Sequence, residues 1–260
     1  MYIFELVKPG VFLKCEDRSQ ASNFQWLLSC LEGAFFDANV SLNLFEAERN
    51  TDFSHDDSSF EQWQRDTQKK KELEMQIRSE RGLSPYTHYD EVNFEVEILF
   101  KKEKWKNGEV PKTHQRRKIF LHAKSFLYSL DTIDKFLKVI SEEQSAPQVI
   151  KDLHARIGND FPHLRGVRNS AQHLEDRARG LGAGRVPKPL DLQPVDNGFF
   201  NVPHRALILN NLCGTKFGST MADGHYGEVD ISPESLVKMQ SIIQQTFDSF
   251  EWDGPKVHLP

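Results

Sequence analysis

Residues 113–143 read THQRRKIFLHAKSFLYSLDTIDKFLKVISEE, and this stretch contains neither glycine nor proline. Its apolar residues recur mostly three or four positions apart. An α-helix has about 3.6 residues per turn, so this spacing places them along one face. We therefore predict a long amphipathic helix with this apolar face: Ile119, Phe120, Phe126, Leu127, Leu130, Ile133, Leu137 and Ile140.

The segments on both sides of this helix show the same kind of spacing. We expect one helix after Ser145 that Pro162 kinks or splits, and a last helix that Ser232 caps and Pro233 begins. The run VNFEVEILF also alternates, which leaves a strand as a competitor there. The remaining helices are predicted over residues 17–49, 60–81, 87–106 and 233–251.

The character of the sequence changes after residues 180–194, a stretch rich in glycine and proline that reads as a loop. The segments RALILNNLCG (205–214) and GHYGEVDIS (224–232) resemble strands. Long helices joined by short turns favour antiparallel packing. We thus predict a mainly α protein, an antiparallel bundle of long helices with a small β-hairpin or sheet before the C-terminal helix. The expected organisation is one domain over residues 1–260, with the β element at about 195–232.

The composition excludes several classes of protein. The chain has 33 lysines and arginines against 38 aspartates and glutamates, so 33 − 38 gives a net charge of −5. A wholly basic nucleic-acid binder is excluded, whereas a local basic patch is not. We expect no transmembrane helix, because no run of about 18 apolar residues occurs. The three cysteines have no CxxC spacing, so we expect reduced thiols, no metal site and a cytosolic location.

The segment HLRGVRNSAQHLEDRARG (163–180) carries the strongest functional signal. Its apolar residues alternate in steps of three and four, which predicts one packed helix whose seam comprises Leu164, Val167, Ala171, Leu174, Ala178 and Leu181. Asn169 and His173 are four residues apart and nearly share a face, while Arg168 lies about 140° from His173 on the polar half. One helix would therefore present a guanidinium, an amide and an imidazole.

The residues Arg168-Asn169-Ser170-Ala171-Gln172-His173 resemble the R-x(4–6)-H motif of the HEPN superfamily. Members of that superfamily are all-helical, many are metal-independent ribonucleases of defence and toxin–antitoxin systems, and they commonly form dimers. The resemblance implies that Arg168 binds phosphate, His173 acts as acid–base and Asn169 assists. It also implies a homodimer, a partner protein such as an antitoxin, and no cofactor.

The same Arg–His spacing occurs elsewhere, and Arg117/His122 is the best competitor because both residues lie on a predicted helix. Two stretches combine histidine with carboxylates, SHDDSS (54–59) and ADGHYGE (222–228), but neither has a recognised metal-loop pattern. Asp223-Gly224 is better explained as a hairpin turn.

A second functional candidate is the basic segment 100–118, in which lysines and arginines surround one tryptophan. Cations next to an aromatic ring could bind a nucleic-acid backbone and stack a base. A solvated helical hairpin explains the same charges without a ligand. Two further interpretations therefore stand beside the ribonuclease: a non-catalytic helical interaction module, and a helical RNA-binding protein. The predicted RNA-binding residues are Lys101, Lys102, Lys104, Trp105, Arg116, Arg117 and Lys118.

Overall fold

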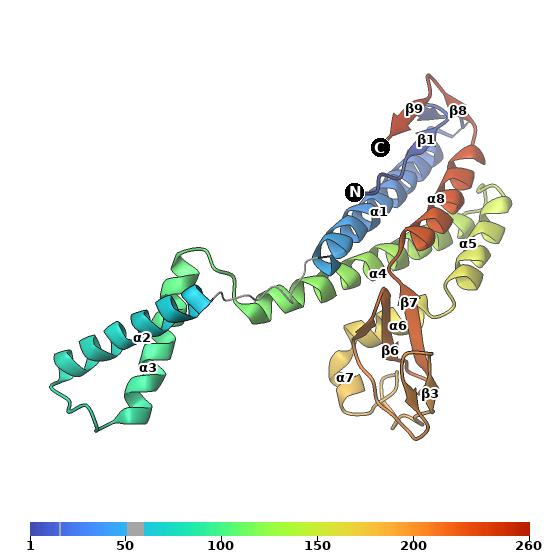
Figure 1. Cartoon of the computed structure of the whole chain (residues 1–260). Coiled ribbons are helices and arrows are strands. Elements are labelled where there is room, and N and C mark those ends of the chain that lie inside the picture. Colours follow the sequence, from blue (N-terminus) through green and yellow to red (C-terminus); the bar gives the residue numbers. More distant parts are fainter. Residues whose placement is uncertain (16, 51–59) are drawn as a thin grey trace. The chain divides into compact units, whose positions relative to one another are not determined.

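The computed structural model describes residues 1–15, 17–50 and 60–260, and this part of the chain is mainly helical (Figure 1). The helices up to residue 160 and the last helix occur where the spacing predicts them, and residues 92–100 are helical rather than extended. Pro162 separates two helices, as expected. The helices are α1 (Arg18–Arg49), α2 (Phe60–Arg81), α3 (Tyr89–Lys106), α4 (Lys112–Glu142), α5 (Val149–Asp160), α6 (Leu164–Gln172), α7 (Leu174–Ala178) and α8 (Pro233–Asp248).

The predicted β element precedes α8. Strands β5 (Asn211–Cys213), β6 (Lys216–Thr220) and β7 (Tyr226–Asp230) form an antiparallel sheet in the order β5-β6-β7, with Phe217 opposite Val229. A second pair, β3 (Val195–Asp196) and β4 (Asn201–Val202), lies earlier in the chain. The expected turn at Asp223-Gly224 joins β6 to β7, and Gly224 has a positive φ of 86° that favours glycine.

The chain divides into two compact units, residues 1–48 with 119–260 (unit 1) and residues 49–118 (unit 2). We describe each unit by itself, and the single domain over residues 1–260 stays a prediction. In unit 2, α2 and α3 form an antiparallel hairpin around a small core of Ile77, Val92 and Val96. Ion pairs join the two helices, including Lys104 to Asp66 at 2.8 Å.

Unit 1 holds the larger hydrophobic core, to which α1, α4, α5, α6 and α8 all contribute. Most of the stripe predicted for residues 113–143 is buried there, from Phe126 to Ile140, whereas Ile119 and Phe120 are half-buried. Ser232 caps α8 as predicted, since its side chain accepts a hydrogen bond from the N–H of Ser235.

The first and last strands of unit 1 pair with each other (Figure 1). Strand β1 (Leu6–Lys8) lies antiparallel to β9 (Val257–Leu259), and β2 (Phe12–Leu13) lies antiparallel to β8 (Trp252–Asp253). The partner strands β8 and β9 lie some 240 residues or more later in the chain, and no local pattern predicts that pairing.

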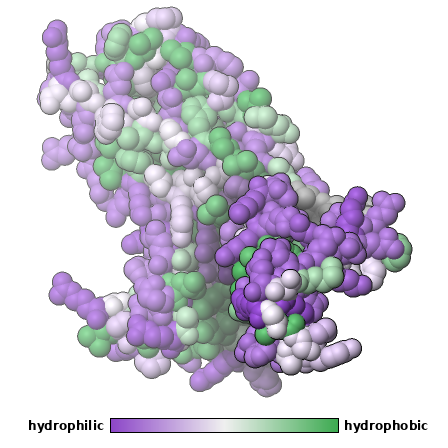
Figure 2. Space-filling view, turned by 90° about the vertical axis from the view of Figure 1, so that its left-hand side faces the viewer, coloured by the Kyte–Doolittle hydropathy of each residue, from purple (hydrophilic) through white to green (hydrophobic). Residues whose placement is uncertain are grey.

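Hydrophilic residues cover most of the face shown in Figure 2, and hydrophobic residues are scattered among them. Among the described helices, none combines the length and the apolar character that a bilayer crossing requires.

Candidate functional site

Helix α6 carries the motif residues, and it is shorter than the sequence predicts. Leu164, Val167 and Ala171 are buried as expected, but the helix ends at Gln172. The prediction of one helix through residue 180 is wrong, because the backbone bends at His173 (φ −104°, ψ 47°) before α7 begins.

After the bend, the buried position is taken by an arginine and not by the apolar residue that the seam predicts. Arg177 is only 1% exposed, whereas Ala178, a predicted seam residue, is exposed. The Arg177 guanidinium donates to Ser170 Oγ at 3.2 Å and to the Leu181 carbonyl at 2.5 Å. These acceptors give the buried guanidinium two hydrogen-bond partners, and they link α6, α7 and the following loop.

Arg168 is buried rather than on an open polar face. Its Nη2 lies 2.8 Å from Asp131 Oδ2 of α4, and its Nη1 donates to Gln172 Oε1 at 2.7 Å. The Nε atom is buried and has no partner among the described residues. Burial raises the pKa of the nearby Tyr128, although the charge of Arg168 partly offsets that rise. The guanidinium is thus already occupied by an internal carboxylate.

His173 is exposed, and its neighbours come from α7 rather than from Arg168. Its Nδ1 lies 3.7 Å from Glu175 Oε1, and its backbone N–H donates to the Asn169 carbonyl at 2.9 Å. Donor atoms of His173, Glu175 and Asp176 lie within 4.8 Å of one another, a composition that could hold a metal ion. Asp176 is already paired with Arg179 at 2.5 Å.

The structure therefore separates the predicted triad. Asn169 is half-buried on α6 and Arg168 faces α4. His173 lies near Glu175 and Asp176, and Asp176 is paired with the exposed Arg179. The sequence LEDRARG contains these neighbours. One continuous helix through this segment does not predict that they lie close to His173.

The predicted basic residues all fall in unit 2. Lys101, Lys102, Trp105, Arg116, Arg117 and Lys118 are exposed. Lys104 differs, because it is paired with Asp66 at 2.8 Å and with Glu109 at 3.3 Å.

The Lys104–Asp66 pair is visible in the pKa values of both groups. Burial would lower the pKa of Lys104, but the hydrogen bonds to Asp66 and Glu109 outweigh that effect and raise it. Burial would raise the pKa of Asp66, but the hydrogen bonds from Lys104 and Gln62 lower it. Asp66 and Glu109 thus neutralise the charge of Lys104 within the hairpin, so Lys104 is a poor candidate for binding an anionic ligand.

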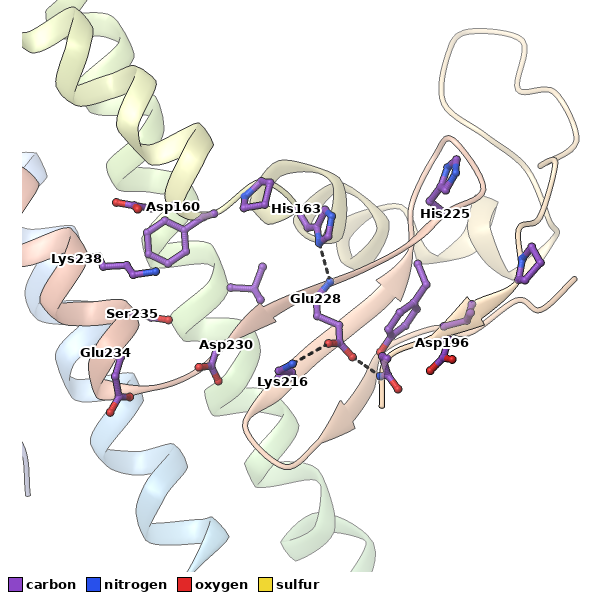
Figure 3. A pocket seen from close by; sticks show the side chains of 17 residues that line it. Asp160, His163, Asp196, Lys216, His225, Glu228, Asp230, Glu234, Ser235 and Lys238 are labelled. Atoms are coloured by element: carbon purple, nitrogen blue, oxygen red, sulfur yellow. Dashed lines mark hydrogen bonds and ion pairs between the residues drawn. The ribbon is translucent and has the colours of Figure 1, made fainter. Parts of the chain in front are cut away.

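A cavity of about 540 Å³ in unit 1 was not expected from the sequence. It lies between the start of α6, the start of α8 and strands β3, β6 and β7 (Figure 3). The backbone N–H of Glu228 donates to His163 Nδ1 at 3.3 Å, so the imidazole proton of His163 is on Nε2 in this arrangement. The carboxylates that line the cavity are Asp160, Asp196, Glu228, Asp230 and Glu234.

Most of these carboxylates already have protein partners. Glu228 binds Lys216 and Asn197, and Asp230 accepts a hydrogen bond from Thr215 at 2.5 Å (Figure 3 draws the Glu228 contacts). Burial raises the pKa of Tyr226 to about 12, so its phenol stays protonated. These contacts join β7 to β6 and to the residue after β3, and the bond to His163 joins β7 to the residue before α6.

Of the two stretches that combine histidine with carboxylates, only residues 222–228 lie in the described part of the chain. Residues 222–228 form the β6–β7 hairpin, and residues 54–59 lie outside the described residues. Comparisons of the chain with protein-family models, curated proteins and solved structures found no match.

Proposed function

We propose that this chain is a HEPN-like, metal-independent endoribonuclease of the cytoplasm, in which His173 is the acid–base group. The observation that carries the proposal is the end of α6 at Gln172. This termination exposes the imidazole beside Glu175 and Asp176, and Arg179 is paired with that Asp176.

The reaction needs only groups that this cluster contains. A neutral His173 takes the proton of a ribose 2′-OH, whose oxygen attacks the adjacent phosphorus. The P–O5′ bond breaks and leaves a 2′,3′-cyclic phosphate, and a protonated imidazole returns a proton to the departing 5′ oxygen. Arg179, whose side chain is 65% exposed, supplies the guanidinium that stabilises the anionic phosphorane by moving from Asp176 to the phosphate.

Arg168 and Asn169 have positioning roles in this proposal. The ion pair of Arg168 with Asp131 ties α6 to α4, and the Asn169 carbonyl holds the backbone of His173. The phosphate-binding role that the family resemblance implies for Arg168 would require that ion pair to break.

Several finer features belong to the same proposal. One chain supplies one such imidazole, so a two-fold homodimer would provide both an acid and a base. The long helices would pack as an antiparallel bundle, and an antitoxin-like protein would restrain the enzyme in a toxin–antitoxin or phage-defence system.

The first prediction concerns RNA cleavage in the presence of EDTA. We expect His173→Ala to lower the cleavage rate by ~100-fold or more, because the acid–base group is lost. We expect Arg179→Ala to lower it by about 100-fold through loss of phosphorane stabilisation. The measurement is the initial rate on a labelled single-stranded RNA, with the cyclic phosphate identified among the products.

His258→Ala is a matched control for this experiment. His258 is as exposed as His173 (61% against 59%) and lies 3.5 Å from the carboxylate of Glu5, so its loss should leave the rate unchanged. Cleavage by His173→Ala at the wild-type rate would overturn the proposal.

A second candidate is a non-catalytic helical interaction protein. It is favoured by one observation, the burial of Arg168 against Asp131, which removes the motif guanidinium from solvent. Wild-type protein that cleaves no RNA, with or without added divalent metal, would support this candidate instead.

A further inference from the structure

One face of α3 in unit 2 points away from α2. Phe94, Ile98, Lys101 and Trp105 fall within an arc of about 60° when each residue advances 100° around the helix. Val92, Val96 and Phe100 are buried on the opposite side, where α3 packs on α2. We call the first four residues the outer stripe of α3.

The outer stripe exposes two aromatic rings. The Phe94 residue is 70% exposed and Trp105 is 47% exposed, while Ile98 between them is half-buried. The two rings are eleven positions apart, which corresponds to about 16 Å along the helix axis. Each exposed ring on this face could serve as a platform on which a base stacks.

Three lysines lie near Trp105 in the C-terminal part of α3. Lys101 approaches Glu97 only at 4.0 Å, and Lys102 and Lys106 form no ion pair within the described part of the chain. Lys104 differs, since Asp66 and Glu109 already neutralise its charge. Aromatic faces with unpaired lysines complement a polyanion that carries planar bases.

We propose that the outer stripe of α3 binds single-stranded RNA, with bases stacked on Trp105 and Phe94 and phosphates contacted by Lys101, Lys102 and Lys106. This inference rests on the proposed function only in taking RNA as the ligand. It assigns binding to unit 2 and the acid–base chemistry to unit 1. Compared with the residues predicted from the sequence, it adds Phe94 and Lys106, removes Lys104 and assigns no contact to Arg116, Arg117 and Lys118.

The test measures the affinity of the full-length chain for a labelled 2′-O-methyl oligouridine at several salt concentrations. This oligonucleotide lacks the 2′-OH nucleophile, so binding is read independently of cleavage. We expect Trp105→Ala and Phe94→Ala each to weaken binding about 10-fold through loss of stacking. We expect Lys102→Ala combined with Lys106→Ala to reduce the slope of log affinity against log salt by about 1–2.

Met75→Ala and Lys71→Ala are matched controls, because both residues are exposed on α2 of the same unit. Neither should alter the affinity. Wild-type affinity in the Trp105→Ala, Phe94→Ala double variant overturns the inference, as does an equal loss in the control variants. RNA cleavage that persists in that case leaves the proposed function standing, whereas stripe-dependent binding without any cleavage overturns the nuclease alone.

Discussion

At the scale of single residues, the environment of Arg168 decides what the motif can do. Its partner, Asp131, lies on a different helix 37 positions earlier, so no local spacing predicts the contact. Both side chains are at most about 10% exposed, which makes the pair a buried one. Removing one partner of such a pair leaves a charge without compensation.

We predict that Asp131→Asn lowers the free energy of unfolding by about 3–5 kcal/mol, because the Arg168 cation then has no anion beside it. Arg168→Met should have a smaller effect, since Lys135 lies 2.8 Å from Asp131 and still compensates it. Urea unfolding monitored by circular dichroism measures both changes.

The exposed pair Lys138–Glu142, at 3.6 Å on the same helix, serves as the control. Lys138→Ala should change the free energy of unfolding by less than about 0.5 kcal/mol. If Asp131→Asn is as stable as the wild type, Arg168 is not held by a buried pair.

At the scale of elements, the position of α6 depends on its contact with the sheet. Helix α6 packs against β6 and β7, and Gly166 faces the side chain of Met221, which follows β6. A Cβ at Gly166 would overlap the Met221 sulfur and its Cγ. The absence of a side chain at this position therefore permits the close approach of helix and sheet.

Two helical glycines allow a direct comparison. Gly158→Ala in α5 meets no atom within 4 Å, so we expect a gain of about 0.5–1 kcal/mol from the better helix propensity of alanine. We expect Gly166→Ala to lose about 1–3 kcal/mol, because the added methyl forces Met221 to move. Thermal and urea unfolding of the two variants give the signs.

The variant Gly166→Ala combined with Met221→Ala should regain part of the loss, since the methyl group would fill space that the methionine vacates. A stabilising effect of Gly166→Ala alone would show that Met221 yields without strain.

At the scale of the whole molecule, the two units differ in the size of their cores. Unit 1 buries an extensive set of apolar residues from five helices and the sheet, whereas the hairpin of unit 2 is held by Ile77, Val92 and Val96 together with ion pairs. Surface ion pairs contribute little to stability, so the small core limits the free energy of unfolding of unit 2.

We therefore expect two unfolding transitions, with unit 2 losing structure at the lower denaturant concentration. Ile77→Ala should shift only the first transition and Leu130→Ala only the second, each by about 2–4 kcal/mol. Hydrogen exchange of the amides in α3 reports the transition of unit 2, and exchange in the core part of α4 reports the transition of unit 1. Coincident transitions in all probes would show that the units unfold together.

The sequence by itself determined α1 to α5 and α8, because their apolar residues repeat with the helical period over uninterrupted segments, whereas it did not predict the break between α6 and α7. It also determined the hairpin before α8 and the capping of α8, which depend on neighbouring residues such as Asp223-Gly224 and Ser232-Pro233. The apolar stripe of residues 113–143 was predictable because burial of one face follows directly from that period.

Only the tertiary structure decided the features that depend on residues far apart in the chain. Arg168 is buried in an ion pair with Asp131 of another helix. Arg177 is buried next to the helix break that exposes His173. Strand β1 pairs with β9 from the other end of the sequence. A helical wheel places a side chain on a face, but the partner on that face comes from another element. The sequence could therefore identify the motif residues, whereas their exposure to solvent depends on contacts between elements that only the tertiary structure shows.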